Sequence, residues 1–136
     1  MIQAKVSGRY EINIWGSGHQ TRSFMYIDDC IYGIHRIMDS EIVDAINLGS
    51  SEMVSVNQLV DIVENIAGVK LKRTYDLGAP KGVVGRNSEN TLIRKLLNWE
   101  PSITLHAGLE KTYAWIYDEY MAREKTSRLA MASAPQ

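Results

Sequence analysis

The chain has 136 residues, of which 45% are hydrophobic and 23% charged, and its fifteen basic and sixteen acidic side chains give a formal charge of -1. This length suits one domain with a core of its own. The balanced charge excludes a general attraction to nucleic acid or anionic lipid, so any anion site has to be local. Because no apolar run approaches the ~18 residues of a membrane span, we expect no membrane partner.

The only cysteine, Cys30, excludes an internal disulfide bond and a cysteine-based zinc cluster. We interpret Cys30 as a small buried hydrophobic residue. The histidines at positions 19, 35 and 106 lack the spacing of metal ligands on a helix, so no bound metal is predicted. No basic and then apolar leader precedes the first strand pattern, and a cytoplasmic location is therefore the expectation.

Residues 10–15 alternate between apolar and polar side chains, which is the pattern of a half-buried strand, and residues 16–18 supply a glycine turn. A second strand is predicted over residues 24–27. Asp28 and Asp29 then offer N-cap oxygens to a helix that ends near position 40. The apolar stripe of this helix is Ile31, Ile34, Ile37 and Met38.

A short apolar strand is predicted over residues 45–48. Ser55 and Gln58 have the spacing of a capping box, in which each side chain satisfies a free backbone amide at a helix start. The helix that follows repeats apolar residues at helical spacing and ends at Gly68 in the C′ position. Residues 70–75 alternate again and predict a partly exposed strand.

A polar, glycine-rich loop over residues 76–90 leads into a short helix over residues 91–97, and a last helix is predicted over residues 105–123. No repeat or linker interrupts the chain, so we expect one domain over residues 1–123 and a C-terminal tail over residues 124–136. The side of the last helix that is expected to pack carries Leu109, Tyr113, Ile116, Tyr117 and Tyr120.

Gly16 and Gly18 follow a strand pattern and raise the question of a dinucleotide-binding loop. That fingerprint needs a third glycine three residues after the second and a helix that begins inside the motif. Position 21 is Thr, and the chain continues as a strand. The glycines therefore predict a turn between strands, not a cofactor loop.

Arg22 and Arg86 lie beside glycine turns, and a guanidinium group can hold phosphate or carboxylate oxygens in a two-pronged contact. A solvated surface charge or an exposed ion pair is the more common role of a single arginine. Composition alone leaves both interpretations open. No nucleophile elbow occurs, so nothing in the sequence supports nucleophilic hydrolysis.

Three stretches resemble the C-terminal part of the extended short-chain dehydrogenase/reductases, the NAD-dependent nucleotide-sugar epimerases and dehydratases. They are "INIWGSGHQTRSFMYIDDC", "AINLGSSEMVSVNQLVDIV" and "PKGVVGRNSENTLIRKLLNWEPSITLHAGLEKTYAWI". Their order and spacing are those of the family, and the resemblance leans toward the members that act on GDP-mannose. It implies a compact α/β substrate domain of mixed α+β type, with short strands, about four helices and no complete Rossmann domain.

The resemblance implies that Arg22 and Arg86 reach the pyrophosphate of a nucleotide sugar. The strand that carries Asn13 and Trp15 would lie along the base. Weaker candidates for polar contacts to phosphate or ribose are Gln20, Asn87 and Ser88. The family's glycine-rich NAD loop and its Tyr-x-x-x-Lys pair are absent from this sequence. We therefore expect no catalytic residue and no cofactor bound by this chain alone.

Three hypotheses follow from this resemblance. The first is a nucleotide-sugar-binding domain, with GDP-mannose as the favoured ligand, that is not an active enzyme by itself. The second is an interaction module with a vestigial ligand site that self-associates into a homo-oligomer, since loss of the cofactor half leaves apolar surface and open strand edges. The third is a subunit of a split epimerase, completed by a separate Rossmann-domain chain.

Overall fold

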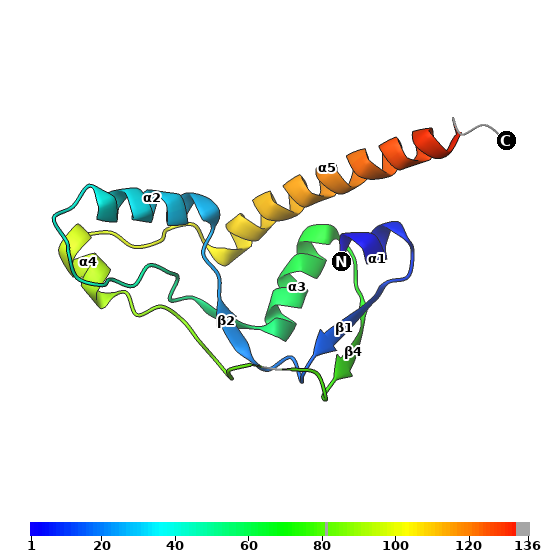
Figure 1. Cartoon of the computed structure of the whole chain (residues 1–136). Coiled ribbons are helices and arrows are strands. Elements are labelled where there is room, and N and C mark those ends of the chain that lie inside the picture. Colours follow the sequence, from blue (N-terminus) through cyan, green and yellow to red (C-terminus); the bar gives the residue numbers. More distant parts are fainter. Residues whose placement is uncertain (81, 133–136) are drawn as a thin grey trace.

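The computed structural model describes residues 1–80 and 82–132, and this part of the chain contains five helices and four short strands (Figure 1). In chain order they are α1 (Ile2–Val6), β1 (Glu11–Trp15), β2 (Thr21–Ser23), α2 (Ile27–Met38), β3 (Met53–Ser55), α3 (Val56–Ala67), β4 (Lys72–Asp76), α4 (Thr91–Leu97) and α5 (Leu105–Ala132). The expected mixed α/β fold is confirmed, with one helix more than the four expected.

The strands form two separate pairs. β1 and β4 are parallel, with Glu11 opposite Lys72 and Trp15 opposite Asp76. β2 and β3 are antiparallel, with Arg22 opposite Val54. The two pairs are joined by the turn between β1 and β2, and both lie in the lower half of the molecule in Figure 1.

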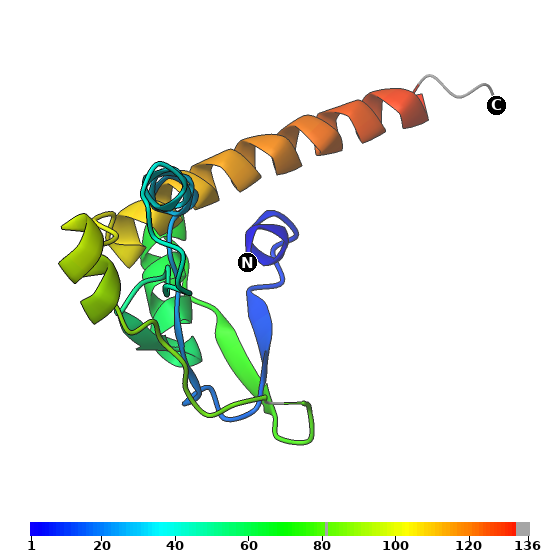
Figure 2. The ribbon, with the colours of Figure 1, turned by 60° about the vertical axis from the view of Figure 1, so that its left-hand side comes forward.

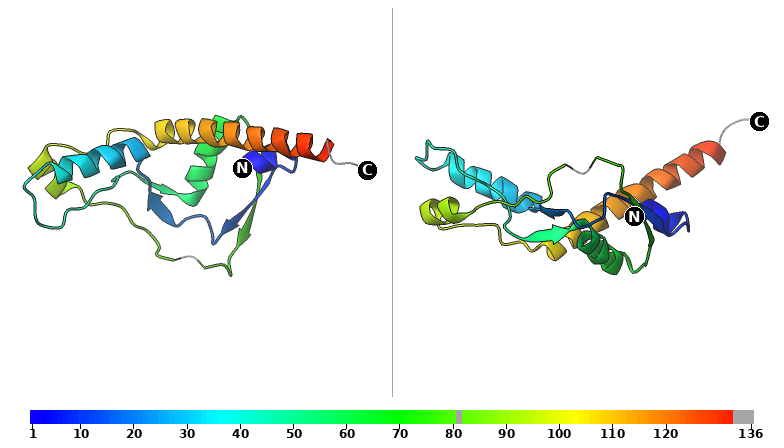
Figure 3. Two further views of the ribbon diagram at one scale, coloured as in Figure 1. Left: turned by 45° about the horizontal axis from the view of Figure 1, so that its top comes forward. Right: turned by 90° about the horizontal axis from the view of Figure 1, so that it is seen from below.

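The helices surround this strand region unevenly. α3 packs against α5 and β3. Figures 1 and 2 show α2 and α4 together at one end of the molecule, and β1, β4 and α1 at the other. α5 passes over the centre, and its C-terminal part extends away from the other elements in both views of Figure 3.

α3 begins and ends as its sequence predicts. The Ser55 side chain accepts a hydrogen bond from the Gln58 amide at 3.1 Å, and the Gln58 side chain accepts one from the Ser55 amide at 2.8 Å. Gly68 follows with φ of 63°, a left-handed conformation that glycine adopts without strain. These local signals are sufficient to fix both ends of the helix.

A buried carboxylate joins α3 to β4. Glu64 has 1% of its surface exposed, and its oxygens accept hydrogen bonds from the Leu71 amide at 3.0 Å, from Lys70 at 2.5 Å and from Arg73 at 2.8 Å. Burial raises the pKa of the Glu64 carboxyl, but the bonds from Lys70, the Leu71 amide and Arg73 outweigh it and hold the pKa below its ordinary value. Glu64 is therefore a charged anchor within the core.

Two strand predictions are wrong. The second strand is β2, before the predicted range 24–27, because Thr21–Ser23 find a partner in β3 and the next residues turn into α2. Residues 45–48 form no strand, because no strand of the described residues pairs with them. Leu48 instead packs beside Gly33 of α2, where an added Cβ would approach the leucine at 2.5 Å.

The expected caps and core face of α2 are also wrong. Its N-cap is Tyr26, and Asp29 accepts hydrogen bonds from the amides of Ser102 at 2.9 Å and Ile103 at 2.7 Å. The helix therefore buries Asp29 and Gly33 against the segment before α5. Of the predicted stripe, Ile31, Ile34 and Met38 are exposed and Ile37 is half-buried. Ile27, one turn before Ile31, is exposed as well and extends this stripe.

α5 continues to Ala132, beyond its expected end at residue 123. Two hydrogen bonds stabilise the first turn of α5 by pairing backbone amides that have no partner within the helix. The Glu52 carboxylate accepts one from the Leu105 amide at 3.0 Å, and the Thr104 hydroxyl accepts the other from the Ala107 amide at 3.3 Å. Residues 133–136 of the expected tail lie outside the described residues. The proposed division at residue 123 stays a prediction.

Candidate functional site

The exposed face of the β1–β4 pair carries two of the candidate residues. Asn13 and Trp15 lie on the same side of β1, and both are exposed, Trp15 to 60% of its surface. Thr74 of β4 donates its hydroxyl proton to the Asn13 side-chain oxygen at 3.2 Å. An indole ring beside amide and hydroxyl groups offers the stacking surface and polar contacts that a nucleobase needs.

Gln20 belongs to the same region, because its side chain donates a hydrogen bond to the Trp15 carbonyl at 2.7 Å. Gly16 and Gly18 have φ of 80° and 76°, values that suit glycine. Gly18 lies against the side chain of Asn57, a residue of α3 that the sequence analysis did not select. Asn57 lies two residues after the capping serine, Ser55, and that position indicates only the start of a helix.

This turn does not fit the pyrophosphate of a dinucleotide cofactor. Such a site presents backbone amides at the start of a helix that follows the glycines. Here the turn leads into β2, and a Cβ placed on Gly18 would collide with the Asn57 carboxamide. The prediction of a turn between two strands is confirmed.

Arg22 lies at the centre of β2, half-buried, and its guanidinium donates a hydrogen bond to the Thr21 carbonyl at 2.6 Å. The loop between β4 and α4 runs along this strand, because the Thr21 amide donates to the Val84 carbonyl at 2.9 Å. Gly82 of the same loop approaches the arginine closely, and a Cβ there would lie 3.5 Å from the guanidinium.

Arg86 follows two residues after the contact with β2, and its side chain is exposed, as is that of Asn87. The fold therefore brings the segment of Arg86 alongside the strand of Arg22, although the two residues are 64 positions apart in the sequence. Two cationic forks on neighbouring segments can share one anion with several oxygens.

Ser88 faces the protein more than the solvent. Its amide donates to the Ser50 carbonyl at 3.2 Å. The Ser88 hydroxyl is buried beside Gly49 and has no hydrogen-bond partner among the described residues. Arg86 and Asn87, whose side chains are exposed, are thus better placed than Ser88 to contact a ligand from solvent.

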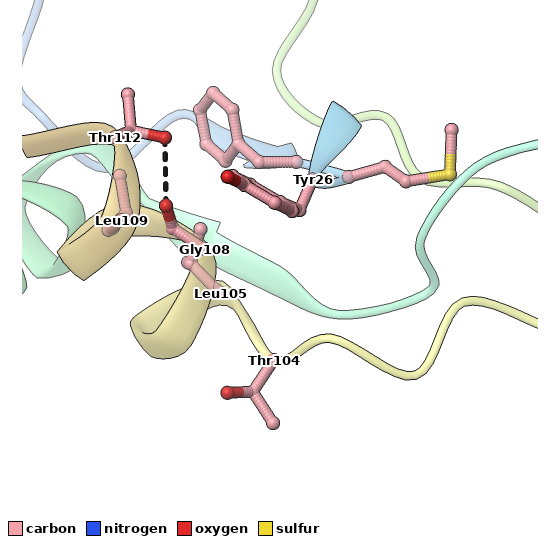
Figure 4. Close-up of a pocket in the computed structure, with 8 residues that line it drawn as sticks. Tyr26, Thr104, Leu105, Gly108, Leu109 and Thr112 are labelled. Carbon is pink, nitrogen blue, oxygen red and sulfur yellow. Dashed lines mark hydrogen bonds between the residues drawn. The ribbon is translucent and has the colours of Figure 1, made fainter. Parts of the chain in front are cut away.

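An apolar cavity of about 210 Å³ lies between the segment after β2 and the start of α5 (Figure 4). Gly108 permits this packing, since a Cβ there would lie 3.1 Å from Tyr26. The labelled lining residues are Tyr26, Thr104, Leu105, Gly108, Leu109 and Thr112. Because no charged side chain lines the cavity, it does not suit a phosphate group.

Within residues 1–80 and 82–132, no three or more histidine, cysteine or acidic side chains gather in a way that could hold a metal ion. No helix in that part of the chain has the length and the apolar character needed to cross a membrane.

Comparison with known sequences agrees with the resemblance. The model of the NAD dependent epimerase/dehydratase family matches residues 1–49. GDP-mannose 3,5-epimerase 1 of Oryza sativa subsp. indica is 42% identical over 124 residues, which are 91% of this chain and 32% of that protein. GDP-mannose 3,5-epimerase of Arabidopsis thaliana is 43% identical over 117 residues, 86% of this chain and 30% of that protein.

Solved structures agree on the fold. UDP-glucuronic acid 4-epimerase from Bacillus cereus, in complex with NAD, aligns with a TM-score of 0.74 at 28% identity, covering 88% of this chain and 37% of that one. UDP-glucose 4-epimerase from Thermotoga maritima, with UDP-glucose, aligns with a TM-score of 0.76 at 25% identity, covering 89% and 38%.

The chain thus spans about a third of the length of the GDP-mannose 3,5-epimerases that it matches. It has the fold of the corresponding part of nucleotide-sugar epimerases. The resemblance to the NAD-dependent epimerase/dehydratase group of extended short-chain dehydrogenase/reductases, inferred from the sequence, is confirmed, in the form of a match to one part of these proteins.

Proposed function

We propose that this chain binds a nucleoside diphosphate sugar, with Arg22 and Arg86 contacting the diphosphate and the face of Asn13 and Trp15 lying beside the base. The observation that carries the proposal is the hydrogen bond from the Thr21 amide to the Val84 carbonyl, which draws the loop of Arg86 onto the strand of Arg22. A diphosphate presents its oxygens to two guanidinium groups at once.

The similar proteins support this class of ligand. GDP-mannose is in the name of relatives that are 42% and 43% identical, while two similar solved structures carry UDP sugars in their names or complexes. GDP-mannose is therefore the favoured ligand. The exposed indole of Trp15 and the amide of Asn13 offer stacking and hydrogen bonding to the base.

Calorimetric titration with GDP-mannose tests the proposal, with UDP-glucose as the second ligand. We expect Arg22→Ala and Arg86→Ala each to weaken binding by roughly tenfold to a hundredfold, the value of a charge-assisted hydrogen bond. Arg123→Ala is the matched control, because Arg123 is an exposed arginine on α5. Unchanged affinity in the double variant of Arg22 and Arg86 would remove the proposed clamp.

A second candidate function is docking to a cofactor-binding domain, which would complete a split epimerase. The observation that favours it is the row of exposed aliphatic side chains on α2, since soluble proteins seldom leave such a stripe to water. Mixing this chain with the remaining part of a GDP-mannose 3,5-epimerase and measuring co-sedimentation tests it. Ile31→Glu should abolish the complex, whereas a complex unaffected by this change would exclude α2 as the contact.

A further inference from the structure

The turn between β1 and β2 is held by the first turn of α3. The Asn57 amide donates to the Gly18 carbonyl at 3.0 Å, and the Val56 amide donates to the Gln20 carbonyl at 3.1 Å. These are two of the backbone amides that a helix leaves without an internal partner at its start. The turn therefore takes the place that a capping side chain or water would otherwise have.

The Asn57 side chain adds a second connection. Its amide nitrogen donates to the Ser17 carbonyl at 3.4 Å, and its oxygen accepts from the Tyr75 hydroxyl at 3.1 Å. Tyr75 belongs to β4, so Asn57 links the turn, α3 and the β1–β4 pair. Gly18 fits against this carboxamide only because it has no Cβ.

We propose that Asn57 is a positioning residue that fixes Trp15 and Arg22 relative to each other by ordering the turn between them. The inference rests on the proposed function, in which Trp15 lies at the base and Arg22 at the diphosphate. A ligand that touches both groups gains affinity when their separation is set before binding, because less ordering remains to be done in the complex.

A positioning role of Asn57 affects long and short ligands differently. GDP-mannose would contact both sides of the turn, whereas inorganic pyrophosphate would contact the arginines alone. We expect Asn57→Ala to weaken binding of GDP-mannose by about tenfold and to change that of pyrophosphate by less than about twofold. Equal loss for the two ligands would overturn the positioning role.

Two variants separate positioning from stability. Asn57→Asp keeps an acceptor for Tyr75 and adds a negative charge in the first turn of α3, which favours the helix, but it removes the donor to Ser17. We expect this variant to melt no lower than the wild type and still to lose GDP-mannose affinity. Gln58→Ala is the matched control, since it weakens the same helix end through the capping box and leaves the turn contacts in place.

Amide hydrogen exchange, measured without ligand, tests the same role separately. We expect faster exchange over residues 16–20 in Asn57→Ala and wild-type exchange there in Gln58→Ala. If the wild type binds neither GDP-mannose nor pyrophosphate, the proposed function fails, while the exchange result still decides the ordering of the turn. Unchanged exchange in Asn57→Ala would overturn the inference, whatever the ligands do.

Discussion

The backbone amide of Thr21 donates a hydrogen bond to the carbonyl of Val84 at 2.9 Å, and this contact joins the strand of Arg22 to the loop of Arg86. Gly85 makes the approach possible, since a Cβ there would lie 2.6 Å from the Thr21 hydroxyl oxygen. The proposed diphosphate clamp thus depends on a small space between Thr21 and Gly85.

The first prediction is that Gly85→Ala weakens binding of GDP-mannose by about tenfold, because the added methyl group pushes the loop away from β2. The guanidinium group of Arg86 is then displaced and loses its contact with the diphosphate. Thr21→Ala removes the opposing hydroxyl, so the double variant should regain most of the affinity. Calorimetry measures all three. Gly78→Ala is the control, as its Cβ would have ordinary contact at 3.5 Å with Asp76. A double variant as weak as Gly85→Ala would contradict the steric explanation.

The second prediction concerns Glu64. Glu64→Ala should lower the free energy of unfolding by about 3 kcal/mol, because it leaves the Leu71 amide and the cationic groups of Lys70 and Arg73 without their buried acceptor. Asp61 contacts the same Arg73 from a half-exposed position, so Asp61→Ala should cost less than about 1 kcal/mol. Denaturant titration compares the two variants.

Glu64 also predicts a dependence of stability on pH. Because the pKa of the folded state lies below the ordinary value of 4.5, the stabilisation is fully present above that pH and is lost as the pH falls through the folded pKa. The free energy of unfolding of the wild type should therefore fall more steeply with decreasing pH below about pH 4.5. In Glu64→Gln the free energy of unfolding should depend less on pH in this range. Parallel curves for the two proteins would exclude Glu64 as the titrating group.

The third prediction concerns Asp29, whose carboxylate accepts from the amides of Ser102 and Ile103. Asp29→Ala removes the partner of two backbone donors and should lower the free energy of unfolding by about 2 kcal/mol. Asp28 is exposed in the same helical turn, so Asp28→Ala should cost no more than about 0.5 kcal/mol, through the helix dipole. Equal melting temperatures for the two variants would contradict the structural assignment.

Asp28 and Asp29 illustrate what the sequence could and could not predict. Local patterns located α3, since its capping box and its C′ glycine lie within a few residues of the helix ends. The role of Asp29 depends on a segment more than seventy positions away, and no local pattern encodes that contact. The N-cap prediction was chemically reasonable, but a distant pair of amides competes for the carboxylate.

The candidate site shows the same division. The family resemblance selects Arg22 and Arg86, whereas composition alone leaves open whether each is an anion contact or a surface charge. The segments that carry them are joined by a long-range backbone contact, the hydrogen bond from the Thr21 amide to the Val84 carbonyl. Asn57 was missed, because its contacts with Ser17 and Gly18 cross from a helix start to a turn far back in the sequence.

The stripe of α2 gives the last prediction. Helical periodicity located its apolar residues correctly, but it could not tell which face of the helix meets the protein. Ile31 is 48% exposed and Met38 73%. When this chain is studied alone, the exposed face of α2 should associate with a second copy, so we expect the chain to form concentration-dependent oligomers.

Sedimentation velocity over a range of concentrations measures this association. Ile31→Glu should raise the dissociation constant at least about tenfold, because it places a charge in the centre of the contact. Val43→Glu is the control, since Val43 is 96% exposed but lies outside the α2 stripe. Retained oligomers in Ile31→Glu would place the contact on another surface. A wild type that stays monomeric at every concentration would show that water alone covers this face, despite the exposed aliphatic side chains.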